Sequence, residues 1–156
     1  MIITIAESQE MKLVEELIPN YTGKIIITGV GMANVVKELK DVPKTEEILN
    51  IGYAGSNKIP KGTVVRISNV RTAHKIAQFV DWCSVSTEMP DWLYELEKLE
   101  KAGCYTSTDF VTEWDGEEPA VFDMELAAIA NMGFSKVMSI KKISDTLNYE
   151  EFKEAE

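Results

Sequence analysis

The sequence is poor in the residues that build metal and redox sites. It has one histidine, His74, and two cysteines, Cys83 and Cys104, in 156 residues. Because no HxH or CxxC pattern occurs and the acids are scattered, we expect no metal site. The distant cysteines favour two free buried thiols in a reducing compartment, with a single disulfide as the alternative.

Long apolar runs and positive charge are also scarce. No apolar run approaches the ~18 residues of a membrane-spanning helix. The start, MIITIAESQEMKL, lacks the cationic and apolar regions of a secretory signal, so we expect a cytoplasmic protein. Sixteen Lys and Arg oppose 26 Asp and Glu, a formal net charge of −10. This balance argues against nucleic acid and against anionic membranes as partners.

Short apolar runs alternate with helical patterns along the chain, which at this length indicates a single domain spanning residues 1–156. Strand–helix alternation predicts an α/β fold with a parallel or mixed central sheet. The expected strands are 1–6, 24–30, 47–55, 62–70, 104–111, 120–124 and 136–144. The expected helices are 8–18, 32–40, 90–103, 125–133 and 148–156.

Three segments follow apolar strands: TGVGMAN (28–34), IGYAGS (51–56) and DME (123–125). Ligands of α/β sheets bind outside the carboxyl ends of the strands, so we expect these segments to meet at one edge of the sheet. Plain turns explain each glycine segment taken alone. TGVGMAN is not a GxGxxG fingerprint, because Asn34 takes its last position, so dinucleotide binding is the weakest hypothesis.

Two acids, Asp123 and Glu125, begin the alanine-rich segment ELAAIANMG. Acids at a helix start are stabilised by the helix dipole, which is one explanation. The helix is nevertheless apolar on nearly every side, which predicts burial, and a buried carboxylate needs hydrogen-bond donors. The hydroxyls of a sugar diol would supply them.

A further acid, Asp145, follows the strand 136–144. A helix cap by Ser144 or Asp145 is one interpretation. The other is a general acid at a strand end. Two carboxylates at strand ends, one binding the sugar and one donating a proton, suit the cleavage of a glycosidic bond.

Five segments in order resemble the nucleoside phosphorylase/nucleosidase superfamily, and in particular its methylthioadenosine/S-adenosylhomocysteine nucleosidase and futalosine hydrolase branch. They are ITGVGMANV, LNIGYAGS, TSTDFV, FDMELAAIA and IKKISDT. The resemblance covers most of the chain. It implies a three-layer α/β/α fold with a mixed, twisted central sheet, and the cleavage of a purine-type nucleoside at its N-glycosidic bond.

The resemblance also implies roles for single residues. Glu125 would bind the ribose hydroxyls, with Met124 packed on the sugar, and Asp145 would protonate the base. Phe110 would stack on the base beside Val111. The remaining binding positions are strand-end or turn residues, namely Ala54, Gly55, Gly29 and Gly31. Protonating the base and placing a carboxylate near the sugar offset the charges that develop as the bond breaks.

The departures from the family pattern concern the attacking group. On ungapped counting Lys12 takes the place of the glutamate that activates water, and Glu10, two residues earlier, substitutes only if the turn shifts. No phosphate-binding loop is recognisable, and the only arginines are Arg66 and Arg71. Water and phosphate, the latter as co-substrate, therefore remain alternative acceptors, and no cofactor is expected.

The altered start of the chain also supports an alternative function, a nucleoside-binding relative with impaired catalysis. The chain is short for the family, so a second copy could complete the pocket. We therefore expect a homo-oligomer, a dimer or hexamer, with the segment FVDWCSV (79–85) at an exposed sheet edge.

Overall fold

The structure is a computed structural model, which describes residues 1–148. Its strands form one mixed sheet, in the order β2-β1-β3-β7-β6-β4-β5, with β8 paired to both β3 and β4. The first three strands in this order are β2 (Lys24–Ile27), β1 (Ile2–Ile5) and β3 (Glu47–Ser56), which run parallel. β7 (Val121–Asp123) is antiparallel to β3, so the sheet is mixed, as the sequence predicts.

The second half of the sheet closes on itself. β6 (Glu100–Thr106) runs parallel to β7 and to β4 (Val64–Thr72), and β5 (Trp82–Ser84) is added antiparallel to β4. β8 (Lys136–Asp145) lies parallel to β3 and antiparallel to β4. The strands β3, β8, β4, β6 and β7 therefore form a closed ring of hydrogen-bonded neighbours.

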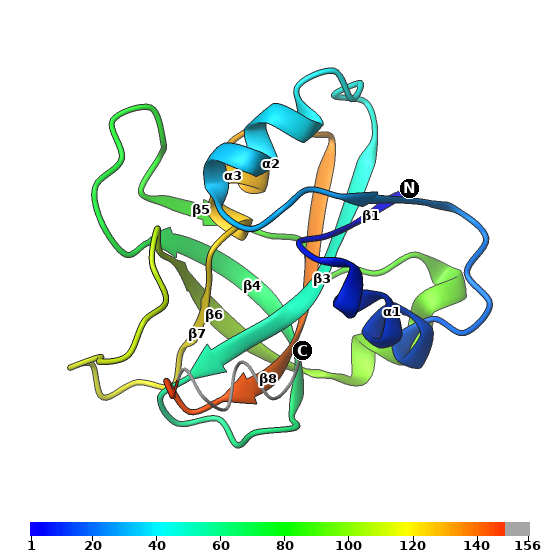
Figure 1. The fold of residues 1–156 in the computed structure, drawn as a ribbon. Coiled ribbons are helices and arrows are strands. Elements are labelled where there is room, and N and C mark those ends of the chain that lie inside the picture. The colour runs from blue at the N-terminus through cyan, green and yellow to red at the C-terminus, as the bar shows by residue number, and fades with distance from the viewer. Residues whose placement is uncertain (149–156) are drawn as a thin grey trace.

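Helices cover both faces of the sheet, as expected for three layers. α2 (Met32–Leu39) and α3 (Leu126–Ala130) pack together on one face, and α1 (Met11–Leu17) lies on the other (Figure 1). The 3₁₀ helices η1 (Ser8–Glu10) and η2 (Asp91–Lys98) complete the described elements. Within the described residues, no helix is long and apolar enough to cross a bilayer.

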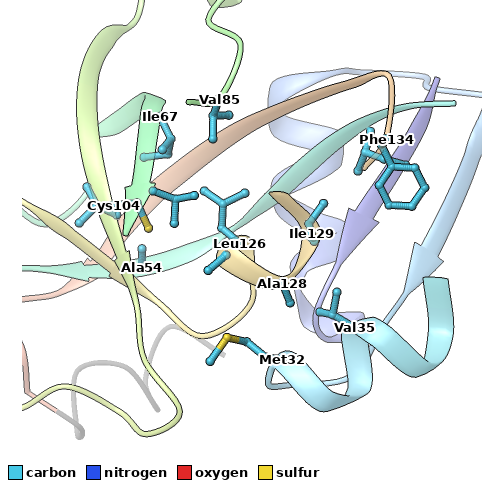
Figure 2. Packing of buried hydrophobic residues seen from close by; sticks show 14 of the residues in the cluster. Met32, Val35, Ala54, Ile67, Val85, Cys104, Leu126, Ala128, Ile129 and Phe134 are labelled. Carbon is cyan, nitrogen blue, oxygen red and sulfur yellow. The ribbon is translucent and has the colours of Figure 1, made fainter. Parts of the chain in front are cut away.

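The apolar side chains form two clusters, one on each face. The α2–α3 cluster brings Met32 and Val35 against Ala128 and Ile129 and continues to Ile67 on β4 (Figure 2). The opposite cluster joins α1 and η2 to β1, β3 and β8. Residues 126–129 of α3 are at most 1% exposed, which confirms the predicted burial of this helix.

The prediction of a helix over 90–103 is wrong. The chain forms η2 with a kink at Leu93 (φ −115°, ψ 27°) and then enters β6 at Glu100. β6 is hydrogen-bonded on both sides, to β4 and to β7, and this pairing outweighs the helical propensity of the charged segment. The strand expected at 104–111 consequently ends at Thr106, and α3 is shorter than predicted.

Two further expectations concern the cysteines and the chain end. Cys104 on β6 and Cys83 on β5 are both free, which confirms the prediction of two thiols, although Cys83 is only half-buried. The helix expected at 148–156 lies almost wholly outside the described residues.

Candidate active site

One pocket lies where β1, β3 and β8 end and where β7 leads into α3. The three segments expected at one sheet edge all contribute to it, which confirms that prediction. The lining residues are Ala6, Glu7, Gln9, Glu10, Val30, Tyr53, Ala54, Gly55, Phe110, Phe122, Asp123, Met124, Glu125 and Asp145. A smaller hollow beside it shares Gly55, Phe110 and Asp145 and adds Val111.

The structure thus brings nearly all the predicted site residues together. Two of the predicted glycines do not line either hollow. Gly31 contacts the site through its backbone, as described below. Gly29 (φ +86°) instead holds the turn after β2, and its N–H donates to the Ala6 carbonyl over 3.0 Å.

Glu10 is the acid at the amino-terminal side of the pocket. It ends η1 and is buried. Its Oε1 accepts hydrogen bonds from the backbone N–H groups of Ala6 (2.8 Å) and Glu7 (3.2 Å), and its Oε2 accepts one from Tyr53 (2.8 Å). Three backbone donors fix a carboxylate firmly in place.

Lys12, by contrast, is exposed on α1, with its ammonium 5.7 Å from the ring centre of Tyr53. It does not line the pocket. The segment that follows β1 carries Glu10 into the pocket, whereas Lys12, two residues later, lies outside it.

Glu125 is the central acid. It precedes α3 but does not cap it, because no side-chain cap bond is formed. Its Oε2 accepts a 2.7 Å hydrogen bond from the N–H of Gly31, the residue before α2. Burial, followed by the nearby charge of Asp123, raises the pKa of Glu125 to about 8, although Lys141 and the Gly31 N–H oppose the rise.

Asp123 explains why two acids occur so close together at the start of α3. Its Oδ2 accepts hydrogen bonds from the N–H groups of Leu126 (2.8 Å) and Glu125 (3.3 Å). Of the two acids expected to stabilise the start of the helix, Asp123 is therefore the one that caps it. The hydroxyl of Thr106 donates to Oδ1 and accepts the N–H of Ala127 at 3.0 Å. Glu125 is thereby left to face the pocket.

Asp145, the last residue of β8, is fully buried. Its carboxylate accepts hydrogen bonds from the Ser144 hydroxyl (3.0 Å) and from the Leu147 N–H (2.9 Å). Gly55, its neighbour on β3, leaves the space that it occupies, because a Cβ at Gly55 would lie 2.6 Å from Asp145 Oδ1. The segment IGYAGS is therefore part of the strand β3 and is not a turn, and its glycines leave room for the side chains of neighbouring segments.

Aromatic rings form the remaining wall. Phe110 and Phe122 line both hollows. Behind Phe122, Trp114 packs with its ring centre 4.9 Å away, and Tyr105 packs 5.9 Å away. Stacking and tilted contacts of this kind stabilise a flat apolar surface.

The arginines and the histidine belong to other parts of the molecule. Arg66 donates to the carbonyls of Leu99 (3.0 Å) and Thr87 (2.8 Å). Arg71 and His74 line a separate groove, and His74 Nε2 lies 3.3 Å from the Ser107 hydroxyl.

Sequence reasoning missed three residues of the site. Tyr53 and Phe122 lie in apolar strand segments, where aromatics are more often core. Lys141, whose ammonium lies 3.2 Å from Asp123 Oδ2, lies in the pair KK, which gives no local sign that one lysine is buried.

Comparisons with known proteins place the fold. No family model and no curated protein matches this sequence. Among solved structures, an MTAN of Helicobacter pylori with 5′-methylthioadenosine in its active site has a TM-score of 0.75 and 14% identity, over 98% of this chain and 89% of that one. MTAN denotes 5′-methylthioadenosine/S-adenosylhomocysteine nucleosidase.

Two other nucleosidases give similar results. The Streptococcus pneumoniae MTA/SAH nucleosidase in complex with 8-aminoadenine has a TM-score of 0.72 and 19% identity, over 98% of this chain and 90% of that one. An MTAN of Chlamydia trachomatis has a TM-score of 0.73 and 18% identity, over 97% and 84%. The chain therefore has the nucleoside phosphorylase/nucleosidase fold, and the three-layer α/β/α prediction is confirmed.

Proposed function

We propose that this protein hydrolyses the N-glycosidic bond of a purine-type nucleoside. The observation that carries the proposal is the convergence of Glu10, Glu125 and Asp145 with Phe110 on one pocket. These residues come from four distant segments of the chain. The fold shared with nucleosidases that hold methylthioadenosine or 8-aminoadenine supports the same assignment.

The proposed chemistry divides the acids between the two ends of the substrate. Asp145 gives a proton to the base, so that the electron pair of the breaking C–N bond leaves on a neutral base. Glu125 accepts hydrogen bonds from the ribose hydroxyls. Glu10 takes a proton from the water whose oxygen forms the new bond to the anomeric carbon. The products are the free base and ribose.

Water is favoured over phosphate as the acceptor by the charge of the pocket. Apart from Tyr53, its ionisable lining side chains are carboxylic acids, among them Glu7 and Glu10, and none of the described lining residues is a lysine, an arginine or a histidine. A phosphate dianion would be repelled by the ionised acids. Arg66 and Arg71, the residues that could have offset this repulsion, lie elsewhere.

The buried position of Glu10 also favours an enzyme over a binding relative with impaired catalysis. That alternative rests on Lys12, which ungapped counting puts at the position of the family's glutamate. Glu10 lines the pocket and accepts three backbone hydrogen bonds, which supports its assignment as the base that activates water.

Base release from adenosine, inosine and methylthioadenosine, measured with and without phosphate, tests the proposal. We expect release in both cases at the same rate. Asp145→Asn should abolish release while nucleoside binding stays within about tenfold (~1.4 kcal/mol). Tight binding without release by the wild-type protein would favour the binding relative, and phosphate-dependent release would indicate a phosphorylase.

Glu125→Ala provides the second arm. It should weaken the binding of nucleosides and leave the binding of free adenine unchanged, because only the nucleoside carries the diol. An equal loss for both ligands would contradict the assigned role of Glu125.

A further inference from the structure

A buried ion pair lies directly behind the pocket. Lys141, in the middle of β8, is 1% exposed, and its ammonium lies 3.2 Å from Asp123 Oδ2. The two side chains are 2% and 1% exposed. Burying a lysine costs several kcal/mol unless its charge is matched, so such a residue calls for an explanation.

The next residue along the strand shows how unusual this position is. Lys142 points to the opposite face, where its ammonium pairs with Glu16 on α1 at 3.0 Å and remains partly exposed. Two adjacent lysines on one strand thus have opposite environments, because side chains alternate between faces. Lys142 is an ordinary surface lysine, and Lys141 is not.

Lys141 also reaches toward the first acid of the site. Its register partner on β3 is Gly52. A Cβ at Gly52 would lie 2.6 Å from Glu10 Oε2 and 3.5 Å from Lys141 Nζ. Glu10 and Lys141 therefore approach the same side-chain-free position, and the glycine leaves room for both.

Four ionisable groups act on this ammonium, and Asp123 at the end of β7 is in direct contact with it. The others, which also act to raise the pKa of Lys141, are Glu125 before α3, Glu10 at the end of η1 and Cys104 on β6. Burial and Asp123 raise the pKa of the Cys104 thiol well above its usual range, so this group is neutral. Three carboxyl groups thus share one cation.

The balance of these charges determines the state of both partners. Burial acts to lower the pKa of Lys141, but Asp123 and Glu125 raise it, and the net pKa is raised, so the side chain stays an ammonium. Burial and Asp123 raise the pKa of Glu125, whereas Lys141 lowers it. Without Lys141, Glu125 would hold its proton more firmly.

We infer that Lys141 is a positioning residue for sugar recognition: its ammonium offsets the charge of the adjacent Asp123 and thereby lowers the cost of ionising Glu125 when the ribose diol binds. The inference rests on the proposed function. An ionised carboxylate accepts hydrogen bonds with both oxygens, whereas in a protonated carboxyl group one oxygen carries the proton and acts as a hydrogen-bond donor. Binding of the diol to a protonated Glu125 would first have to displace the proton.

Binding of two nucleosides separates this role from a structural one. Dissociation constants for adenosine and for 2′,3′-dideoxyadenosine, which lacks the diol, are measured from pH 6 to 9 in the Asp145→Asn background to prevent turnover. Lys141→Met should weaken adenosine binding at pH 7 by roughly tenfold or more and leave dideoxyadenosine within about twofold. The loss should shrink as the pH is raised. Lys141→Arg should restore adenosine binding.

Two controls keep the test decisive. Lys142→Met removes a lysine from the same strand and should leave both constants unchanged. If Lys141→Met does not fold, as judged by circular dichroism, the double variant Lys141→Met/Asp123→Asn removes the pair without leaving a lone buried charge. It should bind adenosine with a weaker pH dependence than the protein that retains both residues.

The outcomes distinguish the inference from the proposed function. If the protein with Lys141 intact binds the two nucleosides equally, no diol site exists and the proposed function itself fails. If it prefers adenosine, but Lys141→Met weakens both ligands alike or neither of them, Lys141 has only a structural role and the inference is overturned.

Discussion

The backbone N–H of Gly31 donates a 2.7 Å hydrogen bond to Glu125 Oε2, and these residues lie 94 positions apart in the sequence. The bond joins the turn before α2 to the start of α3. Because α2 and α3 pack on the same face, it ties the position of the central acid to the packing of the two helices. The glycine turn therefore serves the site by holding a carboxylate.

The raised pKa of Glu125, about 8 against its ordinary value of 4.5, predicts how stability depends on pH. Between these values the folded protein binds more protons than the unfolded chain, so its stability falls as the pH rises. Glu125→Gln removes this titration. Relative to the variant, the wild-type protein should lose on the order of 1 kcal/mol per pH unit between pH 5 and 8. Melting temperatures of the ligand-free proteins at several pH values provide the measurement, and parallel curves would contradict the prediction.

Glu10 and Lys12 are predicted to differ sharply in their effect on turnover. Glu10→Gln keeps the shape of the side chain but removes the base, and we expect kcat to fall by roughly 10²-fold or more, typical of lost general-base catalysis. Lys12→Met should change kcat less than about twofold, because Lys12 is exposed and outside the pocket. Initial rates of base release provide the measurement. The reverse ranking would restore the ungapped assignment.

Gly55→Ala is predicted to displace the proposed general acid. The added Cβ would lie 2.6 Å from Asp145 Oδ1, so the carboxylate must move. We expect kcat to fall at least about tenfold and the free energy of unfolding to fall by about 1–3 kcal/mol, as for other overpacked sites. Gly103→Ala on β6 is the matched control, since its Cβ would meet only the Asn69 side chain, at 3.3 Å. Turnover unchanged by Gly55→Ala would remove Asp145 from the mechanism.

Trp114 should hold the aromatic wall of the pocket. It belongs to the irregular segment 107–120 and packs on Tyr105 (4.6 Å) and Phe122 (4.9 Å). Trp114→Ala should raise KM roughly three- to tenfold, which corresponds to the free energy of about one aromatic contact. Trp114→Phe keeps an aromatic ring and should therefore restore most of the wild-type KM. Trp92→Phe, far from the pocket beside Tyr21, should leave KM unchanged.

The same residue offers a spectroscopic check of the wall. In a Trp82→Phe/Trp92→Phe variant, Trp114 is the remaining tryptophan. Saturating adenine should alter its emission, because Phe122 both packs on Trp114 and lines the pocket. Unaltered emission at saturating adenine would show that the base does not reach this wall.

Much of the fold and most of the site could be predicted from the sequence. The apolar runs KIIITGV and KVMSIKKIS mark two strands, and the acids that follow strands were correctly expected at one sheet edge. KVMSIKKIS is largely buried, but KIIITGV forms the edge strand β2, where Ile27 is 48% exposed, so its expected burial is wrong. The segment 90–103 could not be predicted, because its charges are spaced as in a helix, whereas β6 is stabilised by pairing with β4 and β7. Helix propensity is a property of the local sequence, whereas strand pairing depends on segments that are distant in the chain.

The sequence by itself determined most of the strands and helices, though not β5 or the start of β6, and the chemical nature of the acids at the strand ends. Hydrophobic periodicity and residue type are local properties of the chain, so they can be read without the fold. The tertiary structure decided which acid faces the pocket, which one caps α3, and which of two adjacent lysines is buried among them. Those outcomes depend on the face of the sheet that each side chain takes and on the partners that β7, β8, α2 and α3 bring to it. Segments so distant in the sequence exert their combined field only after the sheet has brought them together.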